Sequence, residues 1–282
     1  MIKTNSEREF FQLTVNRNTV PVGKVDFEGG RQVKKTDLTK SGSYKTDKII
    51  SYHISINQSG KEISDAKVTD ILSTPKISYI KNSFKIEKGK WVIVNNRWVL
   101  KNKINVTEQF TINFISDSQF SVDLGHIKAG EGYRINYKAK ANYNLQNGEI
   151  VENIASLWSS KIKIINSIVK TTYREAGGNA EGYVYSITLH KKDEVSGMPL
   201  TGAIFRVIRD RNGTTVGEFT TDSAGEVTSL NLLKDTYKIK EIKAPAGYQL
   251  FKRKFKITPD KFNNEKTYDL EVLNKRGLVE VN

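Results

Sequence analysis

Three polar residues in the C-terminal third of the chain occupy positions where apolar side chains are expected. Lys191, Glu241 and Asn274 each continue the inward-facing row of a predicted β-strand, because alternate residues of a strand point to the same face. An amine, a carboxyl and a carboxamide are therefore expected to share one core. The rows are Tyr185, Ile187, Leu189 and Lys191, then Tyr237, Ile239 and Glu241, and finally Leu270, Val272 and Asn274.

These three groups can react with one another in a dry core. A lysine is rarely buried without a partner, and desolvation drives its ammonium to lose a proton, which makes the amine a nucleophile. The amine of Lys191 can attack the side-chain amide of Asn274, while a buried acid at Glu241 polarises the carbonyl and protonates the departing nitrogen. The product is an isopeptide bond, with loss of one ammonia. The alternative is a non-covalent Lys–Glu pair in which the asparagine completes the hydrogen bonds.

The N-terminal half has a similar arrangement. Asp70 and Asn153 each interrupt a predicted inward-facing row, and Lys40 is the lysine that we select for this set, with Lys34 and Lys35 as rivals. The alternative for Asp70 is an ordinary buried aspartate that accepts backbone hydrogen bonds. The rows are Ile50, Tyr52, Ile54 and Ile56, then Ala66, Val68, Asp70 and Leu72, and finally Val151, Asn153, Ala155 and Leu157.

Short strands separated by turn residues must position these groups, and helical periodicity is hard to find. Asn95-Asn96, Asn147-Gly148 and Asn212-Gly213 each predict a tight hairpin, because asparagine and glycine tolerate the positive φ of primed turns. Many short strands at this spacing are typical of β-sandwiches. A chain of 282 residues favours two domains, so the predicted fold is all-β with two tandem β-sandwiches.

The domain boundaries are inferred from local composition. Residues 175–182, with the sequence EAGGNAEG, have no apolar anchor and predict a flexible joint. Near the N-terminus, residues 11–15 alternate like a strand, and Pro21 and Gly29-Gly30 are expected to end the strand pattern. We expect a lead-in strand or linker from a missing preceding domain at 1–32, a first sandwich at 33–176, a glycine-containing linker at 177–182, a second sandwich at 183–277 and a tail at 278–282.

Composition argues against several classes of protein. The chain has no cysteine, which removes disulfides, thiolate metal sites and cysteine nucleophiles. Its three histidines, His53, His126 and His190, are isolated, and neither a glycine-rich phosphate loop nor a nucleophile-elbow serine occurs. We therefore expect no metal, no cofactor and no enzyme activity on an external substrate. The bond-forming carboxyls would act once, on their own chain.

Charge and hydropathy bound the partners. The net charge is +14, but the basic residues are spread over predicted strand faces and turns, which favours a solvated surface over a nucleic-acid site. Attraction to an acidic cell wall or host polymer stays open. No apolar run is long enough to cross a membrane, and no leader or sorting motif occurs, so we expect a fragment that does not insert into a membrane.

The C-terminal third carries a series of linked motifs. They are LHKKD at 189–193, Gly197, Pro199-Leu200, GAIF at 202–205, YKIKE at 237–241, APAGY at 244–248 and VLNK at 272–275. These motifs resemble the collagen-adhesin B-type repeat, which is a prealbumin-like (reverse-immunoglobulin) module of Gram-positive surface proteins and pilins. In that family the matching lysine and asparagine are joined covalently and the matching glutamate assists, which implies Lys191, Asn274 and Glu241. Lys192 departs from the pattern, because the family usually has an apolar residue there, and it is expected to face outward.

The N-terminal half carries a second series of motifs. They are LTKSG at 38–42, ISYHISIN at 50–57, VTDIL at 68–72, YRINY at 133–137 and ENIA at 152–155. These motifs resemble the collagen-binding-type domain of Gram-positive adhesins, an immunoglobulin-like sandwich with extra strands (DEv-IgG type). In that family a lysine and an asparagine on the first and last strands are bonded and an aspartate assists, which implies Lys40, Asn153 and Asp70. The family's preceding domain helps to close around collagen, but residues 1–30 are too short for it, so a complete clamp is not expected.

Together these features predict a fragment of a cell-wall-anchored Gram-positive adhesin, located at the cell wall or pilus surface. Its expected partners are a host extracellular-matrix protein of the collagen, fibronectin or fibrinogen class and adjoining domains of the same surface protein or pilus, with no nucleic acid. The first sandwich would bind and the second would serve as a stalk. The alternative is a purely structural stalk or pilus shaft or basal subunit with no ligand of its own.

Overall fold

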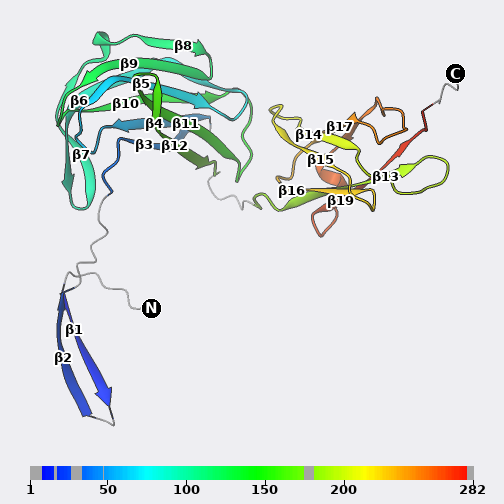
Figure 1. The fold of residues 1–282 in the computed structure, drawn as a ribbon, viewed down its shortest axis with the longest axis horizontal. Helices are drawn as coiled ribbons and strands as arrows, with labels where there is room; N and C mark the ends of the chain where they lie inside the picture. Colours follow the sequence, from blue (N-terminus) through cyan, green and yellow to red (C-terminus); the bar gives the residue numbers. More distant parts are fainter. Residues whose placement is uncertain (1–7, 16–17, 27–33, 47, 175–180, 278–282) are drawn as a thin grey trace.

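The computed structural model describes residues 8–15, 18–26, 34–46, 48–174 and 181–277. Almost every regular element in these ranges is a β-strand, and the helical content is confined to two short 3-10 turns (Figure 1). The prediction of an all-β protein with two tandem sandwiches is confirmed. Among the described residues, no helix has the length and apolar character that a bilayer span requires.

The first sandwich consists of two five-stranded sheets. One sheet has the strand order β3-β4-β10-β6-β7 and the other β12-β11-β5-β9-β8. Alternation places apolar side chains between the sheets, so Ile54 on β4, Val68 on β5 and Ala155 on β11 are completely buried in one core. The elements are β3 (Leu38–Thr46), β4 (Ile49–Ile56), β5 (Ile63–Leu72), β6 (Ile77–Val94), β7 (Arg97–Asn105), the 3-10 turn η1 (Thr107–Gln109), β8 (Ile112–Ser116), β9 (Gln119–Ile127), β10 (Gly132–Ala141), β11 (Ile150–Ser159) and β12 (Ile162–Thr172).

The second sandwich is smaller and has its own core. A three-stranded sheet, β16-β13-β19, faces a four-stranded sheet, β15-β14-β17-β18. The first strand β13 and the last strand β19 pair in parallel, with Lys191 opposite Val272 and Asp193 opposite Asn274. The elements are β13 (Tyr185–Asp193), β14 (Ile204–Arg209), β15 (Thr215–Thr220), β16 (Glu226–Leu232), β17 (Tyr237–Lys243), β18 (Lys254–Ile257), the 3-10 turn η2 (Pro259–Lys261) and β19 (Thr267–Asn274).

Residues near the N-terminus form an antiparallel pair of strands, β1 (Arg8–Val15) and β2 (Asn18–Asp26). The expectation that Pro21 ends the strand pattern is wrong, because Pro21 lies within β2. The register of the pair shifts between Phe10 and Gln12, opposite this proline, and such irregularities tolerate a residue without a backbone N–H. Residues 1–7, 29–30, 177–180 and 278–282 lie outside the described residues.

Two of the three predicted hairpins are confirmed. Asn95 and Asn96 join β6 to β7 with φ of 48° and 55°, and Gly213, at φ 78°, lies in the turn between β14 and β15. The third prediction is wrong. Asn147-Gly148 forms a turn, but β10 and β11 on either side of it belong to different sheets, so this connection crosses the sandwich.

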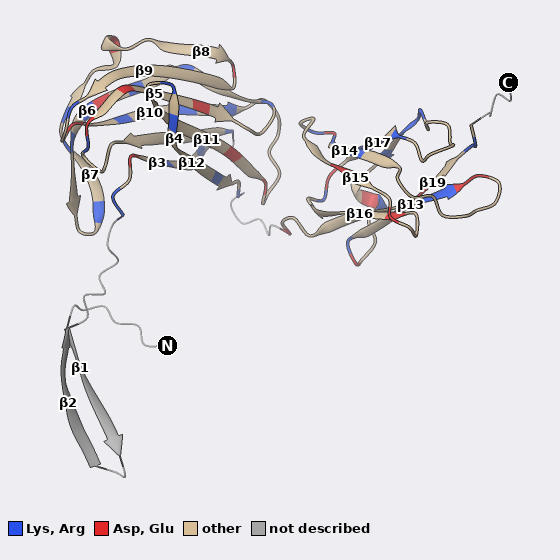
Figure 2. Ribbon diagram, in the orientation of Figure 1, with Lys and Arg blue, Asp and Glu red and all other residues tan. Residues whose placement is uncertain are grey.

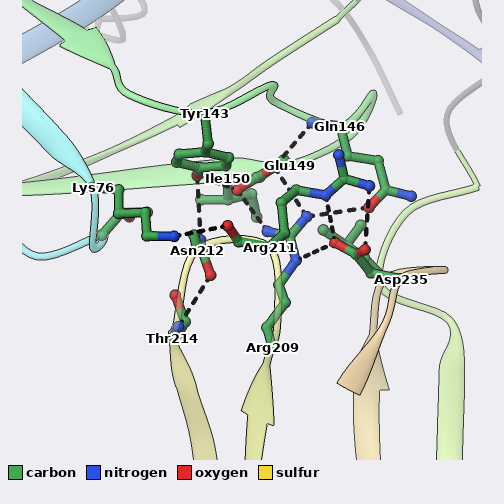
Figure 3. A network of polar contacts seen from close by, with 12 residues as sticks. Lys76, Tyr143, Gln146, Glu149, Ile150, Arg209, Arg211, Asn212, Thr214 and Asp235 are labelled. Atoms are coloured by element: carbon green, nitrogen blue, oxygen red, sulfur yellow. Dashed lines mark hydrogen bonds and ion pairs between the residues drawn. The ribbon is translucent and has the colours of Figure 1, made fainter. Parts of the chain in front are cut away.

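A polar network joins the two sandwiches (Figure 3). Arg209, at the end of β14, is only 6% exposed and donates to both carboxylate oxygens of Glu149, at 2.6 and 3.1 Å. It also donates to Asp235 at 2.7 Å and to the Gln146 side chain at 3.1 Å. Glu149 and Gln146 belong to the first sandwich, in the connection from β10 to β11, so one arginine of the second sandwich is held from both sides.

Further contacts surround this arginine (Figure 3). The Asn212 amide donates to the Tyr143 hydroxyl at 3.3 Å, and that hydroxyl donates to Glu149. Arg211 donates to the backbone oxygen of residue 144 at 3.3 Å, and Lys76 donates to the backbone oxygen of Arg211 at 3.2 Å. The hairpin β14–β15 is therefore fixed against the first sandwich by side chains from both partners.

Basic and acidic positions are interspersed along the ribbons of both sandwiches (Figure 2). Many of them form exposed pairs, such as Arg206 with Glu218 at 2.6 Å and Lys192 with Glu271 at 2.6 Å. Lys192 faces outward, as expected from its place in β13. In the described part of the chain, basic positions thus occur on strands of both sandwiches.

Candidate functional site

The second sandwich brings Lys191, Glu241 and Asn274 together in its core. Lys191 lies on β13, Glu241 on β17 and Asn274 on β19, so the two sheets each contribute to the site. Their exposed fractions are 0%, 0% and 2%. The period of two places them there, because each continues a row of buried apolar residues on its strand.

The three side chains are in direct contact. The amine Nζ of Lys191 lies 2.5 Å from Oδ1 of Asn274 and 3.5 Å from Oε1 of Glu241. The amide nitrogen Nδ2 of Asn274 donates to both carboxyl oxygens of Glu241, at 3.0 and 3.2 Å. The nucleophile therefore faces the carbonyl, and the group that can supply a proton faces the nitrogen that would leave.

Apolar surroundings favour a neutral amine at this site. The rings of Phe205 and Phe251 each lie 5.9 Å from Nζ of Lys191. Desolvation lowers the pKa of Lys191 to about 8, although the charge and hydrogen bond of Glu241 act in the opposite direction. Glu241 is held in place by the backbone N–H of Phe251, which donates to Oε2 at 2.6 Å.

The first sandwich brings a second set of residues together. Lys40 on β3 forms a buried ion pair with Asp70 on β5, and the side chains of both are completely buried. Asn153 on β11 is also 0% exposed. The rival lysines, Lys34 and Lys35, are exposed, so Lys40 is the lysine that reaches the core.

Two tyrosines complete this site, and sequence reasoning missed both. The Tyr137 hydroxyl accepts hydrogen bonds from Lys40 and from Nδ2 of Asn153, the latter at 3.0 Å, and donates to Oδ1 of Asp70 at 2.9 Å. Tyr79 also donates to Oδ1 of Asp70, at 2.8 Å. The row pattern does not mark Tyr137, because it stands in an inward-facing row with Ile135, where an aromatic ring fits a core position.

In this site, as in the second sandwich, burial favours the neutral form of the lysine. Desolvation lowers the pKa of Lys40 to about 8, against the charge and hydrogen bond of Asp70. The carbonyl oxygen of Asn153 is buried and finds no hydrogen-bond partner among the residues that the structure describes. A buried acceptor without a partner is costly, by about 1–3 kcal/mol, so this amide is less stabilised than an ordinary core asparagine.

One expectation about the first sandwich is wrong. The family resemblance implied that Lys40 and Asn153 lie on the first and last strands, and Lys40 does lie on the sandwich's first strand, β3. Asn153, however, lies on β11. A further strand, β12, comes after it and pairs with β11 from Ile150–Thr172 to Ser159–Ile162, with a shift of register between Leu157 and Trp158. A bond between Lys40 and Asn153 would leave β12 outside the closed loop.

The histidines and carboxylates do not form a metal centre in the described part of the chain. His190 lies on the outer face of β13 between Glu226 and Asp269, at 3.0 and 3.1 Å. His53 contacts the Ser41 hydroxyl. These contacts are those of surface side chains with exposed partners.

Comparison with known proteins places the second sandwich in a defined class. Residues 185–276 match the family model of the SpaA prealbumin-like fold domain. The chain is also 30% identical, over 182 residues, to the trypsin-resistant surface T6 protein of Streptococcus pyogenes. That match covers 61% of this chain and 32% of the T6 protein, so the chain spans about a third of the length of this curated relative.

Solved structures of surface proteins are also similar to this chain. The T6 backbone pilin of Streptococcus pyogenes matches with 22% identity over 79% of this chain and 51% of its own, at a TM-score of 0.32. The group B streptococcus pilus 2b backbone protein matches with 17% identity, covering 84% of this chain and 98% of its own, at a TM-score of 0.32. The collagen-binding subdomain of the Enterococcus faecalis surface protein ACE matches with 12% identity, covering 50% of this chain and 99% of its own, at a TM-score of 0.37.

Proposed function

We propose that this chain is a load-bearing part of a Gram-positive surface fibre, a pilus shaft or a stalk, in which each sandwich is stiffened by a Lys–Asn isopeptide bond that it forms itself. The observation that carries the proposal is the contact of Nζ of Lys191 with the Asn274 amide, beside Glu241 in a fully buried site. The sequence match to a streptococcal surface protein supports an extracellular location at the cell wall or pilus.

The mechanical benefit comes from the strands that the bond would connect. Lys191 and Asn274 lie on the first and last strands of the second sandwich. Force that enters along β13 would pass through the bond to the end of β19, and the remaining strands would carry none of it. The bond would also close a loop of 83 residues and stabilise the fold by about 4–5 kcal/mol, by analogy with disulfide loops.

The proposal predicts that the intact protein weighs less than its sequence by two ammonia molecules. Glu241→Gln keeps the shape of the side chain but removes its exchangeable acid proton, so this variant should retain the Lys191–Asn274 ammonia and lose about 4–5 kcal/mol of unfolding free energy. Intact mass spectrometry and denaturant unfolding measure the two effects. Asp70→Asn tests the first sandwich in the same way and serves as the matched control for the second.

A wild-type mass that equals the sequence mass would contradict the proposal for both sandwiches. The wild-type mass could instead fall short by only one ammonia, with the deficit abolished in Glu241→Gln and unchanged in Asp70→Asn. In that case only the second sandwich forms the bond. Tandem mass spectrometry of the cross-linked peptides then identifies which lysine and which asparagine are joined.

Attachment to a host matrix protein is the second candidate function. A groove of about 640 Å³ lies on the outer face of the first sandwich, with Trp158 in its wall and Lys67, Lys161, Asp65 and Asp123 around it. A tryptophan amid charged groups suits a polar polypeptide such as collagen, fibronectin or fibrinogen. Surface plasmon resonance against these three proteins tests this function, with Trp158→Ala as the control. Saturable binding that the variant loses supports an adhesin. If no saturable binding is seen, the pilus shaft or stalk is the function that stands.

A further inference from the structure

We propose that Tyr137 is a catalytic residue of the first sandwich, whose hydroxyl carries a proton between the amine of Lys40 and the departing nitrogen of Asn153. The inference rests on the proposed cross-linking function and adds a fourth reacting group to one of the two sites.

The geometry that supports it is a single oxygen shared by three groups. The Tyr137 hydroxyl accepts from Lys40, accepts from Nδ2 of Asn153 at 3.0 Å and donates to Oδ1 of Asp70 at 2.9 Å. Within the described part of the chain, no hydrogen bond joins Asp70 or Lys40 directly to Asn153. The phenol is therefore the group that connects the Lys40–Asp70 pair to the amide of Asn153.

The contrast between the two sites explains why only one needs a phenol. Glu241 reaches Nδ2 of Asn274 with both of its oxygens, at 3.0 and 3.2 Å. Aspartate is one methylene shorter than glutamate, and the Tyr137 hydroxyl lies between Asp70 and the asparagine. The aromatic rings next to Lys191 belong to phenylalanines, which carry no hydroxyl.

The phenol is fixed in position and keeps its proton. Its ring stacks on Tyr52, with centroids 5.5 Å apart, and on Phe84, at 5.0 Å. Burial raises the pKa of Tyr137 well above its usual value, and the charge of Asp70 acts in the same direction. A neutral hydroxyl can accept one proton while it donates another, as a relay requires.

The reaction balances without any external reagent. Lys40 first gives a proton to Asp70, which leaves a neutral amine beside a carboxylic acid. Nζ of Lys40 attacks Cγ of Asn153, and Nδ2 of the tetrahedral intermediate becomes a proton acceptor. The Tyr137 hydroxyl then turns from Oδ1 of Asp70 to Nδ2, and a proton on Nζ passes to the phenol oxygen while the hydroxyl proton passes to Nδ2. The Cγ–Nδ2 bond then breaks and ammonia leaves. Ammonia takes the proton held by Asp70, so the products are the amide, an ammonium ion, the aspartate and an unchanged tyrosine.

Tyr79 has a different role. Its hydroxyl donates to Asp70 and to the backbone oxygen of Ser118, but it contacts neither the lysine nor the asparagine. It can orient the aspartate, but it cannot move a proton between the reacting nitrogens. Removal of the Tyr79 hydroxyl is therefore expected to slow the reaction less than removal of the Tyr137 hydroxyl.

The test compares Tyr137→Phe with Tyr52→Phe in the full chain. Tyr52 packs against the same site, but its hydroxyl makes no hydrogen bond to Lys40, Asp70 or Asn153. Each protein is made by cell-free translation, and samples are quenched at intervals. After proteolysis, mass spectrometry measures the fraction of the peptide containing Lys40 that is cross-linked to the peptide containing Asn153. We expect at least a hundredfold slower bond formation in Tyr137→Phe and an unchanged rate in Tyr52→Phe.

The Lys191–Asn274 bond of the same molecules is the internal control, since its site contains no tyrosine. A wild-type chain that never forms the Lys40–Asn153 bond would contradict the proposed function of the first sandwich. A wild-type chain that forms it, together with a Tyr137→Phe chain that forms it at the same rate, would overturn the role of the phenol and leave the function intact.

A fluorinated tyrosine at position 137 provides a second test that does not depend on the loss of a hydroxyl. Trifluorotyrosine keeps the hydrogen bonds and nearly the same shape, but its phenol is a stronger acid. If departure of the nitrogen waits for a proton from this phenol, bond formation is expected to become several-fold faster, whereas it becomes slower if uptake of the Nζ proton by the phenol oxygen is limiting. An unchanged rate would overturn the proposal, because a purely structural tyrosine would not respond to its own acidity.

Discussion

Burial controls the reactivity of two lysines that each face a carboxyl group. Desolvation lowers the pKa of Lys40 and of Lys191 to about 8, even though Asp70 and Glu241 act in the opposite direction. An ammonium in water would not attack an amide, so the core supplies the activation that a solvent-exposed pair lacks. The same residues on an outer strand face would form an ordinary surface ion pair.

This coupling predicts how bond formation depends on pH. A neutral amine beside a protonated carboxyl holds as many protons as an ammonium beside a carboxylate, so the reactive form is a tautomer of the ion pair. We expect a constant rate between about pH 6 and pH 7.5, and a fall above pH 8 as the pair loses its shared proton. Time courses of intact mass at pH 6 to 10 measure it, with freshly translated chain.

A rate that continues to rise from pH 8 to pH 10 would contradict this prediction. It would show that deprotonation of the lysine alone limits the reaction and that the carboxyl contributes no proton. The Glu241→Gln chain is the control, because its second sandwich has no acid to share a proton.

At the scale of residues, the sequence predicted most of each site. Lys191, Glu241 and Asn274 could be found because each is a polar residue in an otherwise apolar row, and period-two reading detects that. Tyr137 could not be found in this way, since its ring satisfies the row and its function depends on an oxygen whose three partners come from three other strands. Such contacts depend on sheet order, which local pattern does not encode.

Individual strands determine how each sandwich would respond to tension. In the second sandwich the bonded strands β13 and β19 run parallel, and only a few described residues come after Asn274. In the first sandwich β12 comes after the strand that carries Asn153. The two bonds would therefore protect their sandwiches to different extents: in the second only residues 185–190 of β13 lie outside the ring, whereas in the first the end of β11 and all of β12 follow the bond.

Single-molecule pulling is expected to reveal this difference. When the chain is stretched from its two ends, the segment from Asn153 to Thr172, 19 residues (172 minus 153), can detach while the Lys40–Asn153 bond holds. At about 3.3–3.6 Å per residue this releases roughly 60 Å. Optical tweezers would measure one step of this size from the first sandwich and none from the second.

An Asn153→Ala chain gives the reference for this measurement. Without the bond, the whole first sandwich should unravel and release several times the length. A wild-type chain that shows no step near 60 Å would mean that β12 stays attached at all forces below rupture.

The position of β12 also marks a limit of sequence analysis at the scale of elements. The run IKIINSIVKTT at 162–172 reads as a strand, but nothing local tells that it lies beyond the strand of Asn153 and at the edge of its sheet. In the same way, the turn at Asn147-Gly148 reads as a hairpin, and only the pairing of β10 and β11 with different partners shows otherwise. The local sequence pattern predicts that a segment is a strand, but it does not predict which strands pair with it.

Across the whole molecule, the two sandwiches are coupled by Arg209. Burial alone would lower the pKa of Arg209, but its hydrogen bond to Glu149 and the charges of Glu149 and Asp235 outweigh it and raise the pKa. Glu149 and Arg209 are 60 residues apart and each reads as an ordinary surface charge, so this contact could not be predicted from the sequence. Removal of one partner would leave a buried charge without compensation.

Arg209→Ala is expected to uncouple the sandwiches. Loss of the arginine leaves Glu149 and Asp235 buried without their partner, at a cost of about 3–5 kcal/mol, so the contact should open. NMR relaxation would then show that the two sandwiches tumble separately. Arg206→Ala is the matched control, because Arg206 lies on the same strand in an exposed pair with Glu218 worth about 0–1 kcal/mol. Equal tumbling of both variants would contradict this role of Arg209.

The position of the Arg209–Glu149 contact in the first sandwich also affects how the molecule would respond to tension. Glu149 precedes Asn153 in the chain, so it lies inside the ring that the Lys40–Asn153 bond would close, whereas β12 and the chain that leads to Tyr185 lie outside it. While the ionic contact holds, it would carry the load past β12; when it breaks, β12 would detach from β11, and both contacts can later re-form. The molecule would thus combine permanent covalent cross-links with an ionic contact that breaks under force and re-forms, which suits a tether under repeated load.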